Sequence, residues 1–219
     1  MALVMYDLDG TLLDTAQEIT QAVNLTLKHF EHGSVDEVEI RRWIGHGTSF
    51  LMQQAWAATG RNNDQQHWDS IMKKFAVFYE QTAGTTSRPY PQVMETLELL
   101  KSKGFKQAII TNKEGRYTQK IVRAHGLEKY MDMTISGDTL AVKKPHPGVI
   151  EHCLHELDVM TGQSIFIGDS ETDLATARAA GVVCWAVPYG YNHGRPIAMA
   201  DPDRVIPDIS YVTGYFEGM

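Results

Sequence analysis

Short apolar runs alternate with segments of helical periodicity over most of the chain. Residues 2–6 form a continuous apolar run that ends at Asp7, which predicts a short buried strand. Similar runs predict strands at 106–111, 131–136, 164–167 and 182–187, and helical spacing predicts helices at 93–100, 117–125, 149–157 and 174–180. Because strands that alternate with helices build parallel sheets, we expect an α/β fold with a mostly parallel sheet covered on both faces.

The segment between residues 15 and 83 differs, because its pattern is helical throughout. Apolar residues recur at helical spacing until Gly33 ends the first run, and helix-like runs follow at 50–57 and 68–79. The first strand is therefore separated from the others by an all-helical insertion. We predict an α/β core of residues 1–14 and 85–219, interrupted by a helical domain of residues 15–84.

Polar residues follow the predicted strands, directly or in the loop beyond, at the edge where a sheet of this kind binds its ligands. They are carboxylates, a hydroxyl, an amide and an amine: Asp7, Asp9, Thr111, Asn112, Lys144, Asp169 and Asp173. Four carboxylates at one edge would repel one another unless a divalent cation lay between them. Since Mg²⁺ prefers oxygen ligands and sites shared with phosphate, the aspartates predict a magnesium site.

These residue types fit the transfer of a phosphoryl group. Asp7 as a carboxylate nucleophile would form an acyl phosphate, which divides one difficult displacement into two easier ones. Asp9 lies two residues on and faces the same way in an extended chain, so it can protonate the leaving alkoxide and later deprotonate water. Thr111 and Lys144 would supply the donor and the positive charge that the phosphoryl group needs. The pattern indicates a magnesium-dependent phosphomonoester hydrolase.

Four motifs in this order resemble those of the haloacid dehalogenase-like superfamily: residues 7–14, 111–112, 144–145 and 168–173. The resemblance implies a Rossmann-like core with a mobile helical cap, and it implies that Asp7 is the nucleophile and Asp9 the acid and base. The dehalogenases themselves lack the second aspartate, so Asp9 argues against that branch. For the ligands, the resemblance implies Mg²⁺ binding by Asp7, Asp169 and the carbonyl of Asp9, supported by Asp173, and substrate binding by Gly10, Thr111, Asn112 and Lys144.

Within the superfamily, four further segments resemble the phosphoglycolate phosphatase branch: residues 43–47, 87–91, 143–147 and 189–194. The segment at 189–194 is the most distinctive of them. The chain departs from that branch at Gln92, where the resemblance leads us to expect glycine. This likeness implies that the substrate is 2-phosphoglycolate, a small anionic phosphomonoester.

The helical segment contains a turn that suits such an anion. Gly45–Thr48 reads as a flexible turn that leads into a helix, and backbone N–H groups at a helix start can hold a carboxylate. Nearby side chains offer further donors or positive charge. We therefore expect Arg41, His46 and Gly47 to contact the substrate from the helical segment.

Other readings share this chemistry or this fold. A sugar-phosphate phosphatase, or a mutase like β-phosphoglucomutase that returns the phosphoryl group to its sugar, would use the same core. A phosphonate-cleaving relative would need a lysine in the helical segment, where the candidates are Lys28, Lys73 and Lys74. A catalytically silent protein that binds a phosphorylated metabolite is a further alternative, and the complete set of core residues argues against it.

Composition limits the possible binding partners and the cellular compartment of the protein. The net charge of −7 argues against a nucleic acid as the partner, because nucleic-acid binders present basic faces. No stretch reaches the roughly 18–20 apolar residues of a membrane span, and the N-terminal residues lack the pattern of a secretion signal. Cys153 and Cys184 suit two buried reduced thiols. We expect a cytoplasmic protein that acts as a monomer or a homodimer.

Overall fold

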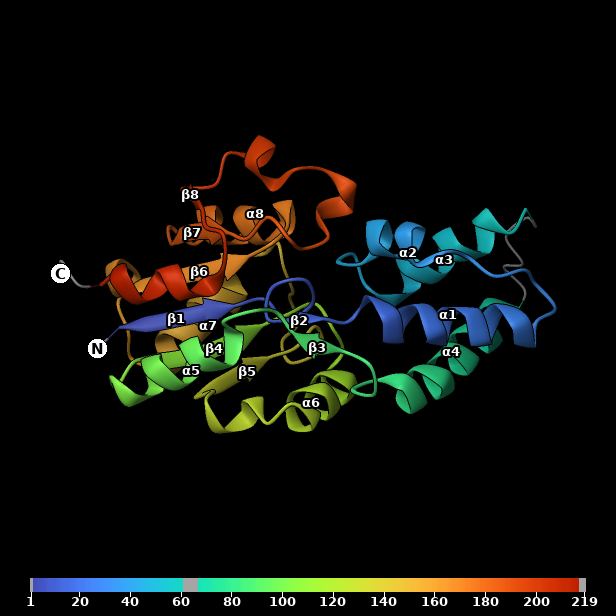
Figure 1. Ribbon diagram of the computed structural model, residues 1–219, viewed down its shortest axis with the longest axis horizontal. Helices are drawn as coiled ribbons and strands as arrows, with labels where there is room; N and C mark the ends of the chain where they lie inside the picture. Colours follow the sequence, from blue (N-terminus) through green and yellow to red (C-terminus); the bar gives the residue numbers. More distant parts are fainter. Residues whose placement is uncertain (1, 61–66, 217–219) are drawn as a thin grey trace.

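A six-stranded parallel sheet forms the centre of the larger part of the molecule, on the left in Figure 1. The computed structural model describes residues 2–60 and 67–216. The strands lie in the order β5-β4-β1-β6-β7-β8. Their bounds are β1 Leu3–Tyr6, β4 Lys106–Ile110, β5 Met133–Ile135, β6 Ser164–Gly168, β7 Val183–Ala186 and β8 Arg204–Val205. Every neighbouring pair in this sheet is parallel, which confirms the predicted fold class.

The central strand β1 has helices on both of its faces, as the sequence predicts. Side chains alternate along a strand, so Leu3 and Met5 enter one core while Val4 and Tyr6 enter the other. The first core includes α7 (Gly148–Glu156) and α8 (Glu171–Ala179), and the second includes α5 (Val93–Ser102) and α6 (Gly115–Ala124). Since β1 pairs with both β4 and β6, the carboxyl ends of these three strands lie side by side.

The helices of the inserted segment lie beside the carboxyl ends of the strands (Figure 1). They are α1 (Ala16–His29), α2 (Glu37–Trp43), α3 (Thr48–Ala58) and α4 (Trp68–Thr82), which we call the cap helices. α1 packs along α4. Buried Leu27, Trp56 and Phe75 belong to their apolar interior, which is continuous with the core around α5 and α6. No strand occurs in the described part of this insertion, in agreement with the helical pattern.

Four short elements were not predicted individually. β2 (Leu13–Asp14) and β3 (Arg88–Pro89) form an antiparallel pair in which Leu13 lies opposite Pro89. This pair joins the two chain segments that enter and leave the cap helices, and two residues per strand are too few to produce a periodic pattern. α2 has one fully buried position, Ile40, and the edge strand β8 is exposed. Such short elements bury too little apolar surface to mark the sequence.

The helix α8 begins at Glu171, three residues before the predicted start at Leu174. Its cap explains the difference, because the Ser170 side chain accepts a hydrogen bond from the Asp173 N–H and Asp173 accepts one from the Ser170 N–H. This reciprocal capping box stabilises a first turn that contains few apolar residues. It also fixes the Asp173 carboxylate at the carboxyl end of β6.

Gln92 occupies a backbone position that suits glycine, as the resemblance predicts. It precedes α5 with a φ of 66°, in the left-handed region. We expect Gln92→Gly to raise the free energy of unfolding by about 0.5 kcal/mol, because relief of strain exceeds the added freedom of the unfolded chain. The exposed Gln53 inside α3 is the matched control, where glycine should cost about 1 kcal/mol. Urea titration distinguishes them, and a loss of stability in both variants would contradict the expectation.

Both cysteines are buried and form no disulfide, as the sequence predicts. Cys153 and Cys184 lie in the core that includes α7 and α8, and burial raises the pKa of each thiol.

Among the helices of the described ranges, none combines the length and the apolar character that a membrane crossing requires.

Candidate active site

Three buried aspartates gather at the carboxyl ends of β1 and β6. Asp7 follows β1, while Asp169 and Asp173 follow β6. Their exposed fractions are 8%, 3% and 0%, and each offers a carboxylate oxygen within 4.8 Å of the others. Residues more than 160 positions apart in the sequence therefore form one acidic cluster, because parallel pairing of β1 with β6 brings the two strand ends together.

Lys144 provides the cation that this cluster needs. Its ammonium nitrogen lies 2.7 Å from Oδ1 of Asp7 and 2.7 Å from Oδ1 of Asp173, and the residue is 4% exposed. Burial lowers the pKa of Lys144, but the two carboxylates outweigh this effect and raise it. The lysine is thus held in its charged form between the predicted nucleophile and the aspartate that caps α8.

The pKa values of the aspartates show that Lys144 offsets only part of the negative charge of the cluster. Burial raises the pKa of Asp7 to about 7, against the opposing effect of Lys144 and with a further contribution from Asp173. The pKa of Asp169 is also raised, first by burial and then by Asp173 and Asp7. Buried carboxylates with this proton affinity fit a hard divalent cation, since it would neutralise the charges that the protein leaves in excess.

The Asp169 carboxylate is fixed by groups from two segments. Its Oδ1 accepts a hydrogen bond of 2.9 Å from the Thr11 hydroxyl, and its Oδ2 accepts one of 2.7 Å from the Tyr191 N–H. Gly10 has a φ of 89°, and a Cβ atom there would lie 2.4 Å from Oδ2 of Asp169. The Gly10 N–H donates to the carbonyl of Leu13. Gly10 therefore permits the close approach of Asp169, whereas the sequence predicted that it contacts the substrate.

The Asp9 carboxylate lies apart from the three clustered aspartates. Its Oδ1 lies 2.9 Å from the ammonium nitrogen of Lys113 and accepts a hydrogen bond of 2.5 Å from the Thr15 hydroxyl. Lys113 is 8% exposed and also hydrogen-bonds the Tyr79 hydroxyl of α4. A metal contact from Asp9 thus stays a prediction for its main-chain carbonyl, while its side chain is available for proton transfer.

Lys113 is a site residue to which the sequence analysis assigned no role. It follows Thr111 and Asn112 directly, so its position after β4 was the available signal. In the structure it is the cation that compensates Asp9, just as Lys144 compensates Asp7. Each of the two predicted catalytic carboxyls therefore has its own buried lysine.

Thr111 and Asn112 line the same cavity as Asp7. The Thr111 hydroxyl oxygen accepts a hydrogen bond of 3.2 Å from the Lys113 N–H, so its proton remains available to an anion. The Asn112 amide nitrogen donates to the carbonyl of Lys144 at 3.0 Å and thereby connects the loop after β4 with the lysine.

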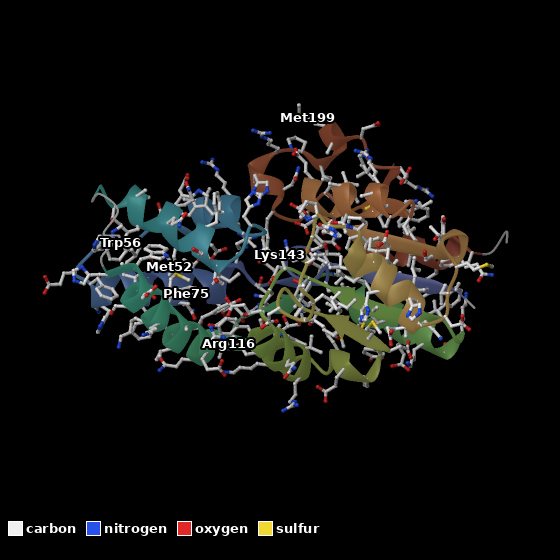
Figure 2. All side chains as sticks on the ribbon, turned by 180° about the vertical axis from the view of Figure 1, so that it is seen from behind. Met52, Trp56, Phe75, Arg116, Lys143 and Met199 are labelled. Carbon is white, nitrogen blue, oxygen red and sulfur yellow. The ribbon has the colours of Figure 1, made fainter. Side chains whose placement is uncertain are left out.

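A cavity of about 220 Å³ lies between the sheet edge and the cap helices. From the core it is lined by Asp7, Asp9 and Asp169, by both buried lysines and by exposed Lys143, which Figure 2 shows at the boundary between the two parts. Met52, Trp56 and Phe75 lie away from this boundary, among the cap helices (Figure 2). The cap contributes the loop between α2 and α3, Ile44–Gly47, which we call the cap loop. His46 and Gly47, expected from the sequence to contact substrate, belong to this wall.

Arg41 does not line the cavity. Its guanidinium nitrogen lies 2.8 Å from both Asp14 and Glu37, and the group sits over the ring of Tyr191 at 5.3 Å. Burial raises the pKa of Asp14, but hydrogen bonds from Arg41 and Tyr191 outweigh that effect and lower it. Arg41 therefore connects α2 to the core near the entry to the cap, instead of reaching the substrate as predicted. The i,i+4 spacing of Glu37 and Arg41 is a sequence signal for their pair, whereas no spacing signals the pair with Asp14, which lies 27 residues away.

Comparisons with known proteins agree with this arrangement. A family model described as haloacid dehalogenase-like hydrolase matches residues 4–187. A phosphoglycolate phosphatase from Mannheimia succiniciproducens is 33% identical over 95% of this chain and 95% of its own length. One from Colwellia psychrerythraea is 36% identical over 91% of this chain and 89% of its own length.

Solved structures show the same fold. A crystal structure of a predicted phosphoglycolate phosphatase from Haemophilus somnus 129PT has a TM-score of 0.93 and 30% identity, covering 98% of this chain and 97% of that one. CbbY from Rhodobacter sphaeroides, solved in complex with phosphate, has a TM-score of 0.81 at 22% identity, covers 97% of this chain and 96% of that one, and supports the fold alone. The resemblance seen in the four motifs is confirmed. The chain belongs to the haloacid dehalogenase-like hydrolase family.

Proposed function

We propose that this enzyme hydrolyses a small phosphate monoester by way of a phosphorylated Asp7, and that the substrate is 2-phosphoglycolate. The observation that carries the proposal is the buried pairing of Asp7 with Lys144 at the floor of the cavity. A carboxylate held at 2.7 Å from a charged lysine has a fixed orientation, and the lysine offsets the repulsion between two anions.

In the first step, an oxygen of Asp7 bonds to phosphorus as the bond from phosphorus to the ester oxygen breaks. The leaving alkoxide takes a proton from the carboxyl of Asp9, which lines the cavity and is held by Lys113 and Thr15. In the second step, Asp9 takes a proton from water as the water oxygen bonds to phosphorus. The bond between phosphorus and Asp7 then breaks, which releases inorganic phosphate and restores both carboxyl groups.

Other residues of the chain bind and orient the phosphoryl group. Thr111 and Lys144 line the cavity beside Asp7 and would donate hydrogen bonds to its oxygens. Mg²⁺ held by Asp7 and Asp169 would supply further positive charge to the phosphoryl oxygens. Asp173 accepts hydrogen bonds from the N–H groups of Asp169 and Ser170, so it holds that strand end in place.

Magnesium binding should depend on pH with a defined sign. In the metal-free fold the pKa of Asp7 is about 7 and that of Asp169 is raised, so protons occupy these oxygens at pH 5.5. The metal-free fold loses stability as pH rises from about 4 towards 7, because the unfolded carboxyls have already ionised. Since the cation replaces those protons, we expect 5 mM Mg²⁺ to raise the unfolding temperature more at pH 8 than at pH 5.5.

Asp169→Asn is the control for that measurement, because it removes one ligand from the cluster. Thermal unfolding of this variant should respond little to Mg²⁺ at either pH. An equal response of the unmodified protein at the two pH values would contradict the competition between proton and cation.

The size of the cavity favours a small substrate. Its volume of about 220 Å³ lies below the roughly 300–1,000 Å³ of sites for drug-sized ligands. The exposed lysine Lys143 lines the cavity from the core, and the start of α3 lines it from the cap, so a substrate carboxylate between them would find positive charge. The names of the curated relatives support the same choice.

A panel of phosphate esters tests the substrate. We expect kcat/KM for 2-phosphoglycolate to exceed that for glucose 6-phosphate by at least about 100-fold, because a bulkier ester must displace the cap loop. A reversed ranking would indicate a sugar-phosphate phosphatase. Phosphoryl transfer between positions of glucose phosphate without release of phosphate would indicate a mutase, and tight binding of phosphoglycolate without turnover would indicate a silent binding protein.

The phosphonate-cleaving alternative receives no support from the site. Lys28, Lys73 and Lys74 all belong to the described residues, and none of the three lines the cavity. Trapping with borohydride in the presence of phosphonoacetaldehyde should therefore label none of them.

For the compartment, we propose the cytoplasm, which the two buried reduced thiols support.

A further inference from the structure

Two histidines from opposite sides of the cavity stack on each other. His46 belongs to the cap loop, and His193 belongs to the core segment Tyr189–Gly194 after β7, which we call the docking loop. Their ring centroids are 4.2 Å apart and their planes differ by 4°. The proposed chemistry uses neither ring, and the docking loop is the segment whose sequence was most distinctive.

The docking loop holds the cap through main-chain and side-chain contacts. Nδ1 of His193 lies 2.9 Å from the carbonyl oxygen of Arg42, so this nitrogen carries a proton and donates it. The side chain of Arg42 packs against Gly194, where a Cβ atom would lie 3.4 Å from it. His193 and its neighbour thus contact both the end of α2 and the cap loop.

The same loop also positions the acidic cluster. The N–H of Tyr191 donates to Asp169 at 2.7 Å, and the Tyr191 hydroxyl donates to Asp14 at 2.8 Å. Gly190 approaches Asp169 so closely that a Cβ atom there would lie 2.2 Å from its Cβ. His193, which contacts the cap, is therefore only two residues from Tyr191, whose N–H orients Asp169.

We infer that His193 is a positioning residue that docks the cap over the substrate through its stack with His46, and that protonation of this pair weakens the docking. The kinetic part of the inference rests on the proposed function, whereas the contact itself does not. Docking that stabilises the closed complex acts on binding of substrate and transition state alike, so it lowers KM more than it raises kcat.

The groups around the histidine pair determine how docking depends on pH. Arg42 lies on the α2 side with its ion pair to Glu39, and Lys143 approaches Gly47 from the core. Glu114 accepts a hydrogen bond from Thr48 and is itself paired with Arg116, and Phe50 contributes an apolar edge to His46. Burial and then the neighbouring His193 lower the pKa of His46. The docked form therefore binds fewer protons than the open form, and docking weakens as pH falls below about 6.5.

Two substitutions at His46 separate the stack from its protonation. His46→Ala removes the ring, and we expect KM to rise about three- to tenfold at pH 8 with kcat within about twofold, as for the loss of one aromatic pair. His46→Phe keeps an aromatic ring but cannot gain a proton. The ratio of KM in the unmodified enzyme to KM in His46→Phe should therefore rise as pH falls from 8 to 5.5, and this ratio cancels ionisation of the substrate.

Exposed His155 on α7 is the control, because it pairs with Glu156 and does not line the cavity. His155→Phe should leave KM unchanged at every pH. An unchanged KM in His46→Ala would overturn the docking role, and a KM ratio that stays flat with pH would overturn the protonation role.

A measurement without substrate keeps the inference separate from the proposed function. The ring-proton signals of His46, followed by NMR titration, should give a pKa below 6.5 in the unmodified protein. His193→Asn suits the left-handed backbone at this position, whose φ is 54°, and removes the imidazole ring. We expect the pKa of His46 to rise in this variant. Equal values in the two proteins would overturn the contact, whether or not any phosphate ester is turned over.

Discussion

Replacing Asp7 with asparagine should lower kcat by at least about 10⁴-fold while the protein remains folded. The amide cannot attack phosphorus, so both proposed steps lose their nucleophile. The change also removes one buried carboxyl whose pKa is raised by burial and by Asp173, so repulsion within the cluster decreases. Phosphate release with 2-phosphoglycolate and Mg²⁺, measured beside thermal unfolding, checks both parts of the expectation.

Asp158→Asn is the matched control for this substitution. Asp158 is exposed beyond α7 and has a φ of 51°, a backbone conformation that asparagine adopts readily. Its kcat should equal that of the unmodified enzyme. If Asp7→Asn kept more than about one hundredth of the turnover, a loss of roughly 3 kcal/mol or less in transition-state stabilisation, Asp7 would be excluded as the nucleophile.

The largest effect on stability is expected at Lys144. Methionine has a similar length but no charge, so Lys144→Met would leave Asp7 and Asp173 buried without their shared cation. Removal of one member of a buried ion pair costs about 3–5 kcal/mol, and we expect a loss of that size at pH 8. At pH 5 the loss should be smaller, because the pKa of Asp7 is already raised to about 7 and a proton neutralises it. Urea titration at the two pH values measures the difference.

Lys143→Met tests whether the effect belongs to the buried lysine alone. Lys143 precedes Lys144 in the sequence but is exposed, and its substitution should change the free energy of unfolding by no more than about 0.5 kcal/mol. Equal losses in the two variants, or a loss in Lys144→Met that does not depend on pH, would show that the acidic cluster does not need this cation.

The sequence predicts the core of the site well because of how parallel strands end. Asp7 and Asp169 each follow an apolar run, and adjacent parallel strands place their carboxyl ends together whatever lies between them in the chain. The same rule locates Thr111, whereas Lys144 lies nine residues beyond the end of β5 and was found through its motif. The four-motif resemblance then adds the expected chemistry. The match to the family model supports membership of the family independently of the geometry.

The contacts that were not predicted depend on packing between distant segments. Lys113 is adjacent to two predicted residues, yet its role follows from the ion pair with Asp9 and from Tyr79 of the cap. Arg41 looks like a free cation near the cap loop, but the structure pairs it with Asp14 and Glu37. Partners from distant segments, such as Asp14 for Arg41 and Asp9 for Lys113, leave no periodic signal, so the sequence cannot choose between a bound substrate and an internal carboxylate.

Gly10 shows a further limit of reading motifs residue by residue. The structure explains the missing side chain by the close approach of Asp169, and the expected contact of Gly10 with the substrate stays a prediction. A glycine signal indicates close approach without naming what approaches. In contrast, Gln92 was noticed as a departure from glycine, and its left-handed φ shows that the backbone requirement persists after the residue has changed.

The phosphorylated carboxylate itself can be detected directly. During turnover of 2-phosphoglycolate, the enzyme is mixed rapidly with borohydride, which reduces an acyl phosphate to an alcohol and leaves a free carboxylate intact. Mass spectrometry of the peptides should then find homoserine at position 7 in the presence of substrate and aspartate in its absence. Homoserine at another aspartate, or unmodified Asp7 while phosphate is being released, would contradict covalent catalysis by this residue.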